Sequence, residues 1–322
     1  MVAHLGPELV KTLITGAAGM IGRKLSARLS REHDLILHDV VPAGPGSVAS
    51  DLSAPGEAEK LVAGRPDVIF HLAAIVSGEA EADFEKGYRI NLDGTRLLFE
   101  AIRKTGGYKP RVVFASSIAV FGAPFPEAIG DEFVNAPLTS YGTQKTICEL
   151  LLSDYSRKGF FDGIGLRLPT ICVRPGKPNL AASGFFSGII REPLAGQEAV
   201  LPVPETVRHW FASPRAAIGF LVHAAKIDTA QLGARRNLSM PGISATVGEQ
   251  IESLRRVAGE KVVRLIRRQP DATIMRIVDG WPRNFDARRG AALGFRADAS
   301  FDDIIRFHLE DERIPAPRPG SA

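Results

Sequence analysis

The sequence of 322 residues predicts an α/β fold, in which a doubly wound parallel sheet is followed by a smaller C-terminal α/β substrate-binding domain. Two observations predict this fold class. In the first half, short apolar runs alternate with amphipathic segments, which is typical of parallel strands covered by helices on both faces. A glycine-rich turn also separates the first apolar run from the first helix, as in sheets that bind a dinucleotide.

The first element is a buried strand over residues 11–15, which runs into a turn that contains Gly16, Gly19 and Gly22. In this spacing one glycine allows a tight turn, one lets backbone N–H groups approach a pyrophosphate, and one lets the next helix pack close to the strand. The helix expected over residues 20–31 presents the positive end of its dipole to phosphates. The segment therefore predicts a nucleotide cofactor.

The second strand, expected over residues 34–39, ends in Asp39. This residue lies about 20 positions after the glycines, where a carboxylate can accept hydrogen bonds from the ribose hydroxyls of an adenosine. The same carboxylate would repel a 2′-phosphate, so the sequence favours NAD over NADP. The other interpretation is that Asp39 only begins a turn before residues 40–42.

The alternation continues as far as residue 168, and beyond it the pattern loosens and proline and glycine cluster. We expect strands at residues 68–72, 111–115 and 164–168, and helices at 84–104 and 141–158. The division predicts an NAD-binding domain over residues 1–170, which carries the catalytic residues. It also predicts a substrate-binding region over residues 171–322 that is partly threaded back into the first domain.

Composition excludes several classes of protein. Hydrophobic residues make up 45% and charged residues 24%, and the formal net charge is +4 without a lysine-rich run, so nucleic-acid binding is not expected. No apolar stretch approaches 18 residues and no leader pattern appears, which predicts a cytoplasmic protein without a membrane partner. Cys148 and Cys172 lie among apolar residues, which predicts buried thiols and no metal site.

Two further motifs turn a cofactor-binding fold into an enzyme hypothesis. Ser116 and Ser117 follow the fourth strand, and Tyr141 and Lys145 have the Y-x-x-x-K spacing that places both on one face of a helix. A lysine ammonium there is expected to lower the pKa of the tyrosine, so that its phenolate removes a hydroxyl proton while hydride leaves the carbon. Ser117 can orient the same oxygen. The other interpretation is a tyrosine and a lysine on an ordinary helix.

The order of these motifs resembles the extended branch of the short-chain dehydrogenase/reductase superfamily, which includes NAD-dependent epimerases and dehydratases. The resemblance implies catalysis by Ser117, Tyr141 and Lys145, with Ser116 in a neighbouring structural position. It also implies that Asp51 and Leu52 border the adenine. The cofactor-binding residues that follow from the motifs and the resemblance are Gly16, Gly19, Met20, Ile21, Gly22, Asp39, Asp51, Leu52, Ala73, Ala74, Ile75, Asn91, Ser116, Tyr141, Lys145 and Pro169.

The substrate is predicted from a departure and from arginines. Nucleotide-sugar enzymes of this branch usually carry an asparagine where this chain has Thr170, which argues against a nucleotide sugar. A guanidinium binds a carboxylate in bidentate fashion, and Arg208 first and Arg174 second are the candidates for a substrate acid. The other interpretation of each arginine is a solvated charge on the surface. Ser77 is expected to hydrogen-bond a substrate hydroxyl, unless its segment is only a solvated loop.

Within the branch, these segments and residues 272–286 resemble the D-erythronate dehydrogenase group. The resemblance implies oxidation of D-erythronate, or a similar sugar acid, to the 2-keto acid with NAD. Two alternatives stay open, a UDP-sugar 4-epimerase and a non-catalytic NAD-binding sensor or scaffold. The resemblance also implies a homodimer, in which helices near residues 91–104 and 141–158 pair through faces that include the following leucines: Leu97, Leu98, Leu151 and Leu152.

Overall fold

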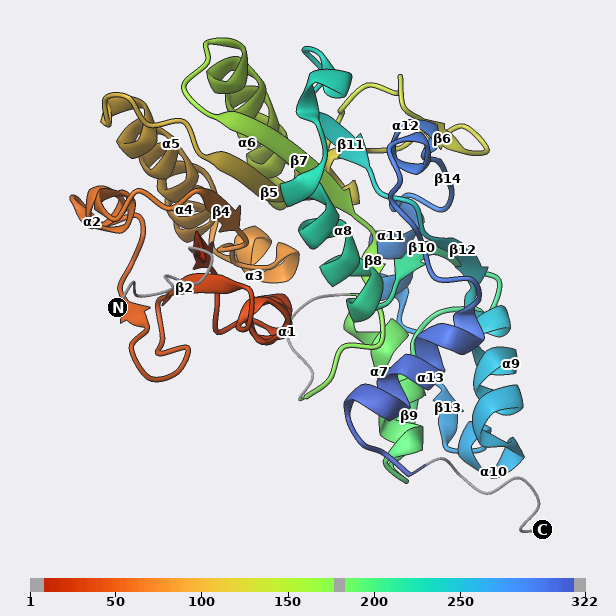
Figure 1. Ribbon diagram of the computed structural model, residues 1–322. Helices are drawn as coiled ribbons and strands as arrows, with labels where there is room; N and C mark the ends of the chain where they lie inside the picture. The colour runs from red at the N-terminus through yellow and green to blue at the C-terminus, as the bar shows by residue number, and fades with distance from the viewer. Residues whose placement is uncertain (1–8, 177–182, 316–322) are drawn as a thin grey trace.

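A large parallel sheet forms the centre of the first half in the computed structural model, which describes residues 9–176 and 183–315 (Figure 1). Its strand order is β11-β7-β5-β4-β1-β2-β3, and every neighbouring pair is parallel. The strands are β1 (Val10–Thr15), β2 (His33–Asp39), β3 (Val48–Ala49), β4 (Val68–His71), β5 (Arg111–Ser117), β7 (Asp162–Leu168) and β11 (Asn237–Ser239). The predicted doubly wound α/β fold is confirmed.

The strand order reverses at β1, which pairs with β2 on one side and β4 on the other. Thr15 and His71 are paired at the carboxyl ends of β1 and β4. Ligands of open parallel sheets bind in the crevice outside such a reversal, because the two following connections diverge to opposite faces. The glycine turn after Thr15 and the segment after His71 therefore flank the same crevice.

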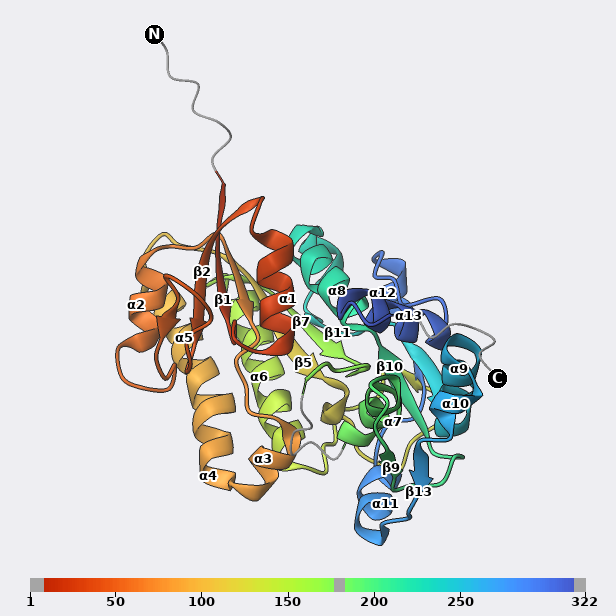
Figure 2. The ribbon, with the colours of Figure 1, turned by 90° about the horizontal axis from the view of Figure 1, so that it is seen from below.

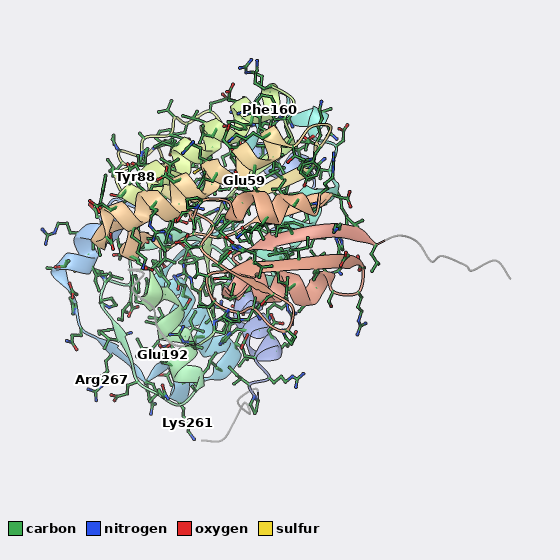
Figure 3. All side chains as sticks on the ribbon, turned by 90° about the vertical axis from the view of Figure 1, so that its left-hand side faces the viewer. Glu59, Tyr88, Phe160, Glu192, Lys261 and Arg267 are labelled. Atoms are coloured by element: carbon green, nitrogen blue, oxygen red, sulfur yellow. The ribbon has the colours of Figure 1, made fainter. Side chains whose placement is uncertain are left out.

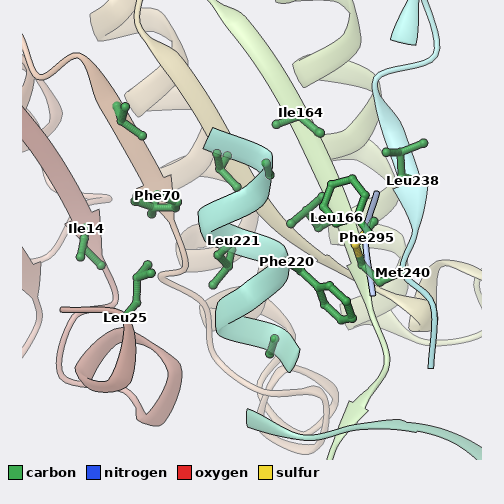
Figure 4. Packing of buried hydrophobic residues seen from close by; sticks show 14 of the residues in the cluster. Ile14, Leu25, Phe70, Ile164, Leu166, Phe220, Leu221, Leu238, Met240 and Phe295 are labelled. Atoms are coloured by element: carbon green, nitrogen blue, oxygen red, sulfur yellow. The ribbon is translucent and has the colours of Figure 1, made fainter. Parts of the chain in front are cut away.

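Helices cover both faces of the large sheet because successive strand residues point to opposite sides. Ile14 and its neighbours pack with α1 and α8, and Figure 4 shows this layer with Leu25, Phe70, Phe220 and Leu221. Leu13 lies in the opposite layer, which includes side chains of α2, α5 and α6. These helices are α1 (Met20–Leu29), α2 (Glu57–Ala63), α5 (Gly94–Lys104), α6 (Ser140–Arg157) and α8 (Pro214–Lys226).

The second half builds a separate core, and the elements that form this core lie beside the large sheet in Figure 2. In Figure 3, Glu59, Tyr88 and Phe160 mark the first half, and Glu192, Lys261 and Arg267 mark the second. Besides α8, the helices of the second half are α7 (Gly184–Leu194), α9 (Val247–Ala258), α10 (Glu260–Val263), α11 (Ala272–Asp279), α12 (Arg288–Ala292) and α13 (Phe301–Asp311). Three small sheets comprise β8 (Thr170–Ile171), β10 (Arg208–Ala212) and β12 (Ile243–Thr246); β9 (Ala199–Leu201) and β13 (Ile266–Arg268); and β6 (Ile129–Gly130) and β14 (Phe285–Asp286).

A strand of the second half completes the large sheet. Strand β11 pairs with β7 in parallel, with Leu238 opposite Leu166. Both side chains belong to the layer that contains Ile14 and α8. The large sheet is therefore completed by residues far beyond the predicted domain boundary at residue 170.

Two predicted segments differ in detail. Residues 84–104 form one uninterrupted helical run as predicted, which Asp83 caps and in which a π-helical stretch (Tyr88–Asp93) separates a short α4 (Phe84–Gly87) from α5. Ser77, considered as part of a loop, is the first residue of α3 (Ser77–Ala82), whose Ala80 is buried. Two 3₁₀ turns complete the helices, at Ile118–Val120 and Thr229–Leu232.

The described ranges lack a helix with the length and apolar character that a membrane crossing requires. They also lack a group of three or more histidine, cysteine, aspartate or glutamate side chains that could hold a metal ion. Cys148 and Cys172 are free and buried.

Candidate active site

The glycine turn closes tightly against the strand beside it. Gly16 has a φ of +76°, and a Cβ built there would lie 2.7 Å from the backbone nitrogen of Ala73. A Cβ at Gly22 would lie 2.2 Å from the carbonyl oxygen of Gly16, so this glycine lets α1 approach the turn. Gly19 caps α1 without a side-chain hydrogen bond. The positive end of α1, with Met20 and Ile21 in its first turn, is therefore available to a phosphate group.

Asp39 fixes the other side of this turn. Its Oδ2 accepts a hydrogen bond from the Ala18 backbone nitrogen at 2.9 Å, and its Oδ1 accepts one from Val40 at 2.7 Å. The carboxylate is only half-buried at the end of β2. It thus lies beside the glycine turn and retains acceptor capacity for ribose hydroxyls.

Asp51 is already held by other side chains. Its Oδ1 accepts from the Ser53 backbone and hydroxyl at 2.9 and 2.6 Å, and its Oδ2 pairs with Arg89. Leu52 is 6% exposed and belongs to the layer beneath. The predicted adenine border is therefore a fixed polar cluster above a buried leucine.

The segment after β4 is anchored from the helical side. Asn91 accepts from the Ile75 backbone nitrogen at 2.9 Å and donates to Gln144 on α6 at 2.8 Å. Ala73 and Ala74 lie between this anchor and the Gly16 contact. Asn91 thus ties the wall of the crevice to the helix that carries Tyr141.

Ser117, Tyr141 and Lys145 come together from β5 and α6. The Lys145 ammonium donates to the Ala115 carbonyl at 2.8 Å and lies 5.7 Å from the centre of the Tyr141 ring. Ser117 acts on the Tyr141 phenol through a hydrogen bond that favours its charged form. The predicted trio is therefore assembled on the carboxyl edge of the sheet.

The electrostatics differ from the sequence expectation. Burial raises the pKa of Tyr141 to about 12, although Arg174 and the Ser117 hydroxyl both lower it. Burial also lowers the pKa of Lys145 to about 8. The prediction that Lys145 brings the pKa of the phenol down does not hold in this structure. The loss of solvent raises the pKa more than the Arg174 charge and the Ser117 hydroxyl lower it.

Ser116 has a structural position. Its hydroxyl donates to Glu149 at 2.6 Å, and Glu149 is 1% exposed and forms a bidentate ion pair with Arg167. Asn135 donates to the same carboxylate at 3.0 Å. This cluster joins β5, β7 and α6 directly behind Ser117 and Lys145, so the Ser116 hydroxyl is already engaged within the protein.

Gly142 is a site residue that the motifs do not reveal. A Cβ there would lie 2.1 Å from the Ala119 carbonyl oxygen and 2.9 Å from Pro137. Only glycine lets the first turn of α6 pack this closely against the turn after Ser117. In the sequence, the one feature that indicates this close packing is a glycine directly after the tyrosine of Y-x-x-x-K.

The end of β7 leads to a second group of candidates. Pro169 is buried, and the Thr170 hydroxyl is 2.6 Å from Nε2 of His209. The Arg174 side chain donates to the Ile171 carbonyl and to Ser183, and it is close enough to Tyr141 to lower the pKa of the phenol. Arg174 therefore belongs to the neighbourhood of the phenol.

Arg208 lies in a different environment. Its guanidinium donates to the Ser244 carbonyl at 3.1 Å and forms an ion pair of 3.2 Å with Glu249. A substrate carboxylate would have to displace or share that partner. Ser77 is half-buried at the start of α3, and α3 packs against α6.

Comparison with known proteins places this geometry in a family. The model of the NAD dependent epimerase/dehydratase family matches residues 12–228, which is more than half of the chain. The chain belongs to this family.

Relatives within the family are similar over nearly the whole chain. D-erythronate dehydrogenase of Cupriavidus necator is 46% identical over 94% of this chain and 98% of its own length. D-erythronate dehydrogenase of Haemophilus influenzae is 42% identical over 94% and 99%. A crystal structure described as a nucleoside-diphosphate-sugar epimerase from Agrobacterium tumefaciens is 64% identical, covers 97% of this chain and 98% of its own, and has a TM-score of 0.90.

The family and these relatives identify the general chemistry. The chain is an oxidoreductase that uses a nicotinamide cofactor.

Proposed function

We propose that this chain oxidises D-erythronate to 2-dehydro-D-erythronate with NAD. The observation that carries the proposal is the assembly of Ser117, Tyr141 and Lys145 beside Arg174, in a chain similar over its length to relatives named D-erythronate dehydrogenase. A phenol for the hydroxyl proton and a guanidinium for a carboxylate are the two groups that oxidation of a 2-hydroxy acid needs.

The residues of the crevice fit the cofactor. The glycine turn and the uncapped N-terminus of α1 suit a pyrophosphate, and Asp39 suits an unphosphorylated ribose. The nicotinamide ring, when bound, accepts the hydride and adds positive charge near the phenol. Lys145 would hold the ribose next to that ring, and Pro169 would contact the nicotinamide end.

Tyr141 acts as general base in the proposed step. Its phenolate takes the proton of the substrate C2 hydroxyl while the C2–H bond releases a hydride, so the C2–O bond becomes a carbonyl. Ser117 donates to the same oxygen and holds it at the phenol. Arg174 and Ser117 favour the phenolate against the cost of burial.

Arg174 is the first candidate to bind the substrate carboxylate, and Arg208 becomes the second. Arg174 acts electrostatically on Tyr141, whereas Arg208 is paired with Glu249. Ser77 remains the candidate for a hydroxyl of the substrate. We further propose that the enzyme works in the cytoplasm as a homodimer.

The test is NADH formation, followed at the absorbance band of the reduced cofactor. Purified protein with NAD and D-erythronate is expected to release NADH, and Tyr141→Phe is expected to lose at least about 1,000-fold in kcat, since it removes the base. A Tyr108→Phe variant serves as control, because Tyr108 is buried away from the site against the Pro66 carbonyl. Full activity of Tyr141→Phe would exclude the assigned base.

A nucleotide-sugar epimerase is the second candidate, because the 64% identical structure is described as one. An epimerase returns the hydride to its substrate and shows no net NADH. The epimerase would be favoured over the dehydrogenase if the protein interconverts the isomers of a UDP-sugar without NADH release and forms no NADH with C4–C6 aldonates.

A further inference from the structure

His209 is a buried polar residue that the motifs do not use. It lies on β10, is 2% exposed, and stacks on Phe186 with ring centres 5.1 Å apart. Phe211 and Trp281 approach the same imidazole, with ring centres 5.3 and 5.4 Å away. Three aromatic rings thus fix the plane of the imidazole and keep water from it.

One edge of the ring is committed to Thr170. Nε2 of His209 and Oγ1 of Thr170 are 2.6 Å apart, and the parallel pairing of β8 with β10 sets Thr170 opposite Phe211. Thr170 is only half-buried, so it is the member of the pair that can meet a ligand. It also directly follows Pro169, at the end of the strand whose edge carries the site.

The other edge of the ring determines which partner donates. Nδ1 has no hydrogen-bond partner among the described residues, and the Pro282 backbone and the Arg174 charge are the other polar groups that act on the ring. Burial lowers the pKa of His209 to about 4, so the ring is neutral at pH 7. The Pro282 backbone raises the pKa of His209, as a group that accepts from the ring does, and Nε2 is already engaged by Thr170. This combination assigns the proton to Nδ1 and leaves Nε2 as an acceptor. The Thr170 hydroxyl then donates to Nε2 and offers its lone pairs outward.

We propose that His209 is a positioning residue that makes the Thr170 oxygen an acceptor, so that this position selects a substrate hydroxyl rather than a carboxylate. The inference rests on the proposed function. Arg174, which also acts on His209, takes the carboxylate. The substrate class is thereby narrowed to acids that carry a second hydroxyl besides the one oxidised, because an acid without it leaves the Thr170 lone pairs unpaired.

The first experiment does not depend on activity. Nitrogen-15 NMR of histidine-labelled enzyme, with the His209 signals assigned by their loss in His209→Gln, reports which ring nitrogen carries the proton. We expect a protonated Nδ1 and an unprotonated Nε2 between pH 6 and 8. A proton on Nε2 would overturn the inference whatever the substrate is.

The second experiment measures selectivity, as the ratio of kcat/KM for D-erythronate to that for (R)-2,4-dihydroxybutanoate and for the 4-deoxy acid. The unchanged enzyme should disfavour one of the two deoxy acids by at least about 100-fold. Thr170→Val and His209→Phe should reduce that ratio to below about 10, and His209→Gln, whose amide oxygen can accept from Thr170, should restore most of it. If His209→Phe lowers all rates equally and leaves the ratio unchanged, His209 is only structural. Absence of turnover with every acid, alongside the expected tautomer, would instead count against the proposed function.

Discussion

At the scale of single residues, charge around the Tyr141 phenol controls the proposed chemistry. The phenol has lost most of its solvent, which raises its pKa to about 12, and Arg174 is the first group that lowers it. Lys145 is bound to the Ala115 carbonyl and lies against the ring. Arg174 thus has two proposed functions, since it favours the phenolate in the free enzyme and binds the acid.

This arrangement predicts a particular pH dependence. Because the base must be deprotonated and its pKa is raised, kcat/KM for oxidation should increase with pH from 6 to 9. Arg174→Met should move that rise upwards by about one pH unit and increase KM for the acid, since a nearby positive charge is lost. Arg174→Lys should keep the rise in place and change mainly KM. Arg215→Met, which changes an arginine in the first turn of α8 that is paired with Asp311, is the control; an unshifted profile in Arg174→Met would refute the coupling.

The buried ion pair behind Ser116 gives a prediction of stability. Glu149→Gln leaves Arg167 buried without its partner, so the free energy of unfolding should fall by about 3 kcal/mol. Equilibrium unfolding in urea measures it. Asp154→Asn, which removes an exposed partner of Arg157 on the same helix, should change it by less than about 0.5 kcal/mol. Equal losses in both variants would contradict the importance of burial.

At the scale of elements, the start of α6 sets the geometry between Ser117 and Tyr141. Thr139 caps the helix by accepting from Gly142, and Ser140 donates its backbone N–H to Glu81 on α3. The backbone at Gly142 lies directly against Ala119. The position of the phenol is therefore determined by backbone contact, with no side chain in between.

Gly142→Ala should consequently impair chemistry more than cofactor binding. The added methyl group forces α6 away from the turn after Ser117, and a displacement of about 1 Å reduces kcat on the order of 100-fold. Stopped-flow NADH formation and NAD titration separate the two effects. Gly219→Ala on α8 has open space around it and is the matched control, expected to keep full activity. A Gly142→Ala enzyme with normal kcat would mean that α6 tolerates the shift.

At the scale of the whole molecule, the pairing of two copies of the chain through α5 and α6 remains a proposal. Of the leucines expected there, Leu98 and Leu152 are wholly buried in the protein's own core, and Leu97 and Leu151 are half-buried. Leu150 is 66% exposed and was not among them. Any pairing through these helices therefore depends on Leu150 more than on the predicted set.

We expect the protein to have the mass of a dimer in light scattering coupled to gel filtration, and Leu150→Asp to convert it to a monomer. A charge buried in a pairing surface without a partner is costly. Val200→Asp introduces the same charge at a comparably exposed position on β9 and should remain dimeric. A monomeric unchanged protein, or a dimer indifferent to Leu150→Asp, would exclude this surface.

The sequence reveals those features that depend on a few consecutive residues. The parallel sheet, the glycine turn and the one-turn spacing of Tyr141 and Lys145 are local in this sense. Arg208 pairs with Glu249, and Thr170 pairs with His209, in each case across about 40 positions of the sequence. The hydrophobic periodicity of the sequence does not reveal such contacts. The raised pKa of Tyr141 also depends on how much of the fold covers the phenol, which spacing cannot show.

The late return of β11 to the large sheet affects how the chain is made. During synthesis, β7 is finished about 70 residues before its outer partner leaves the ribosome, a delay of about 3 to 14 seconds at ordinary rates of translation. Throughout that interval the nascent chain has an unpaired parallel edge, the kind of edge that recruits other chains. A chain that ends at residue 170 lacks β11, so the outer edge of β7 would stay unpaired. The first half expressed alone is therefore expected to aggregate, whereas rare codons after residue 240 should leave the yield of folded protein unaffected.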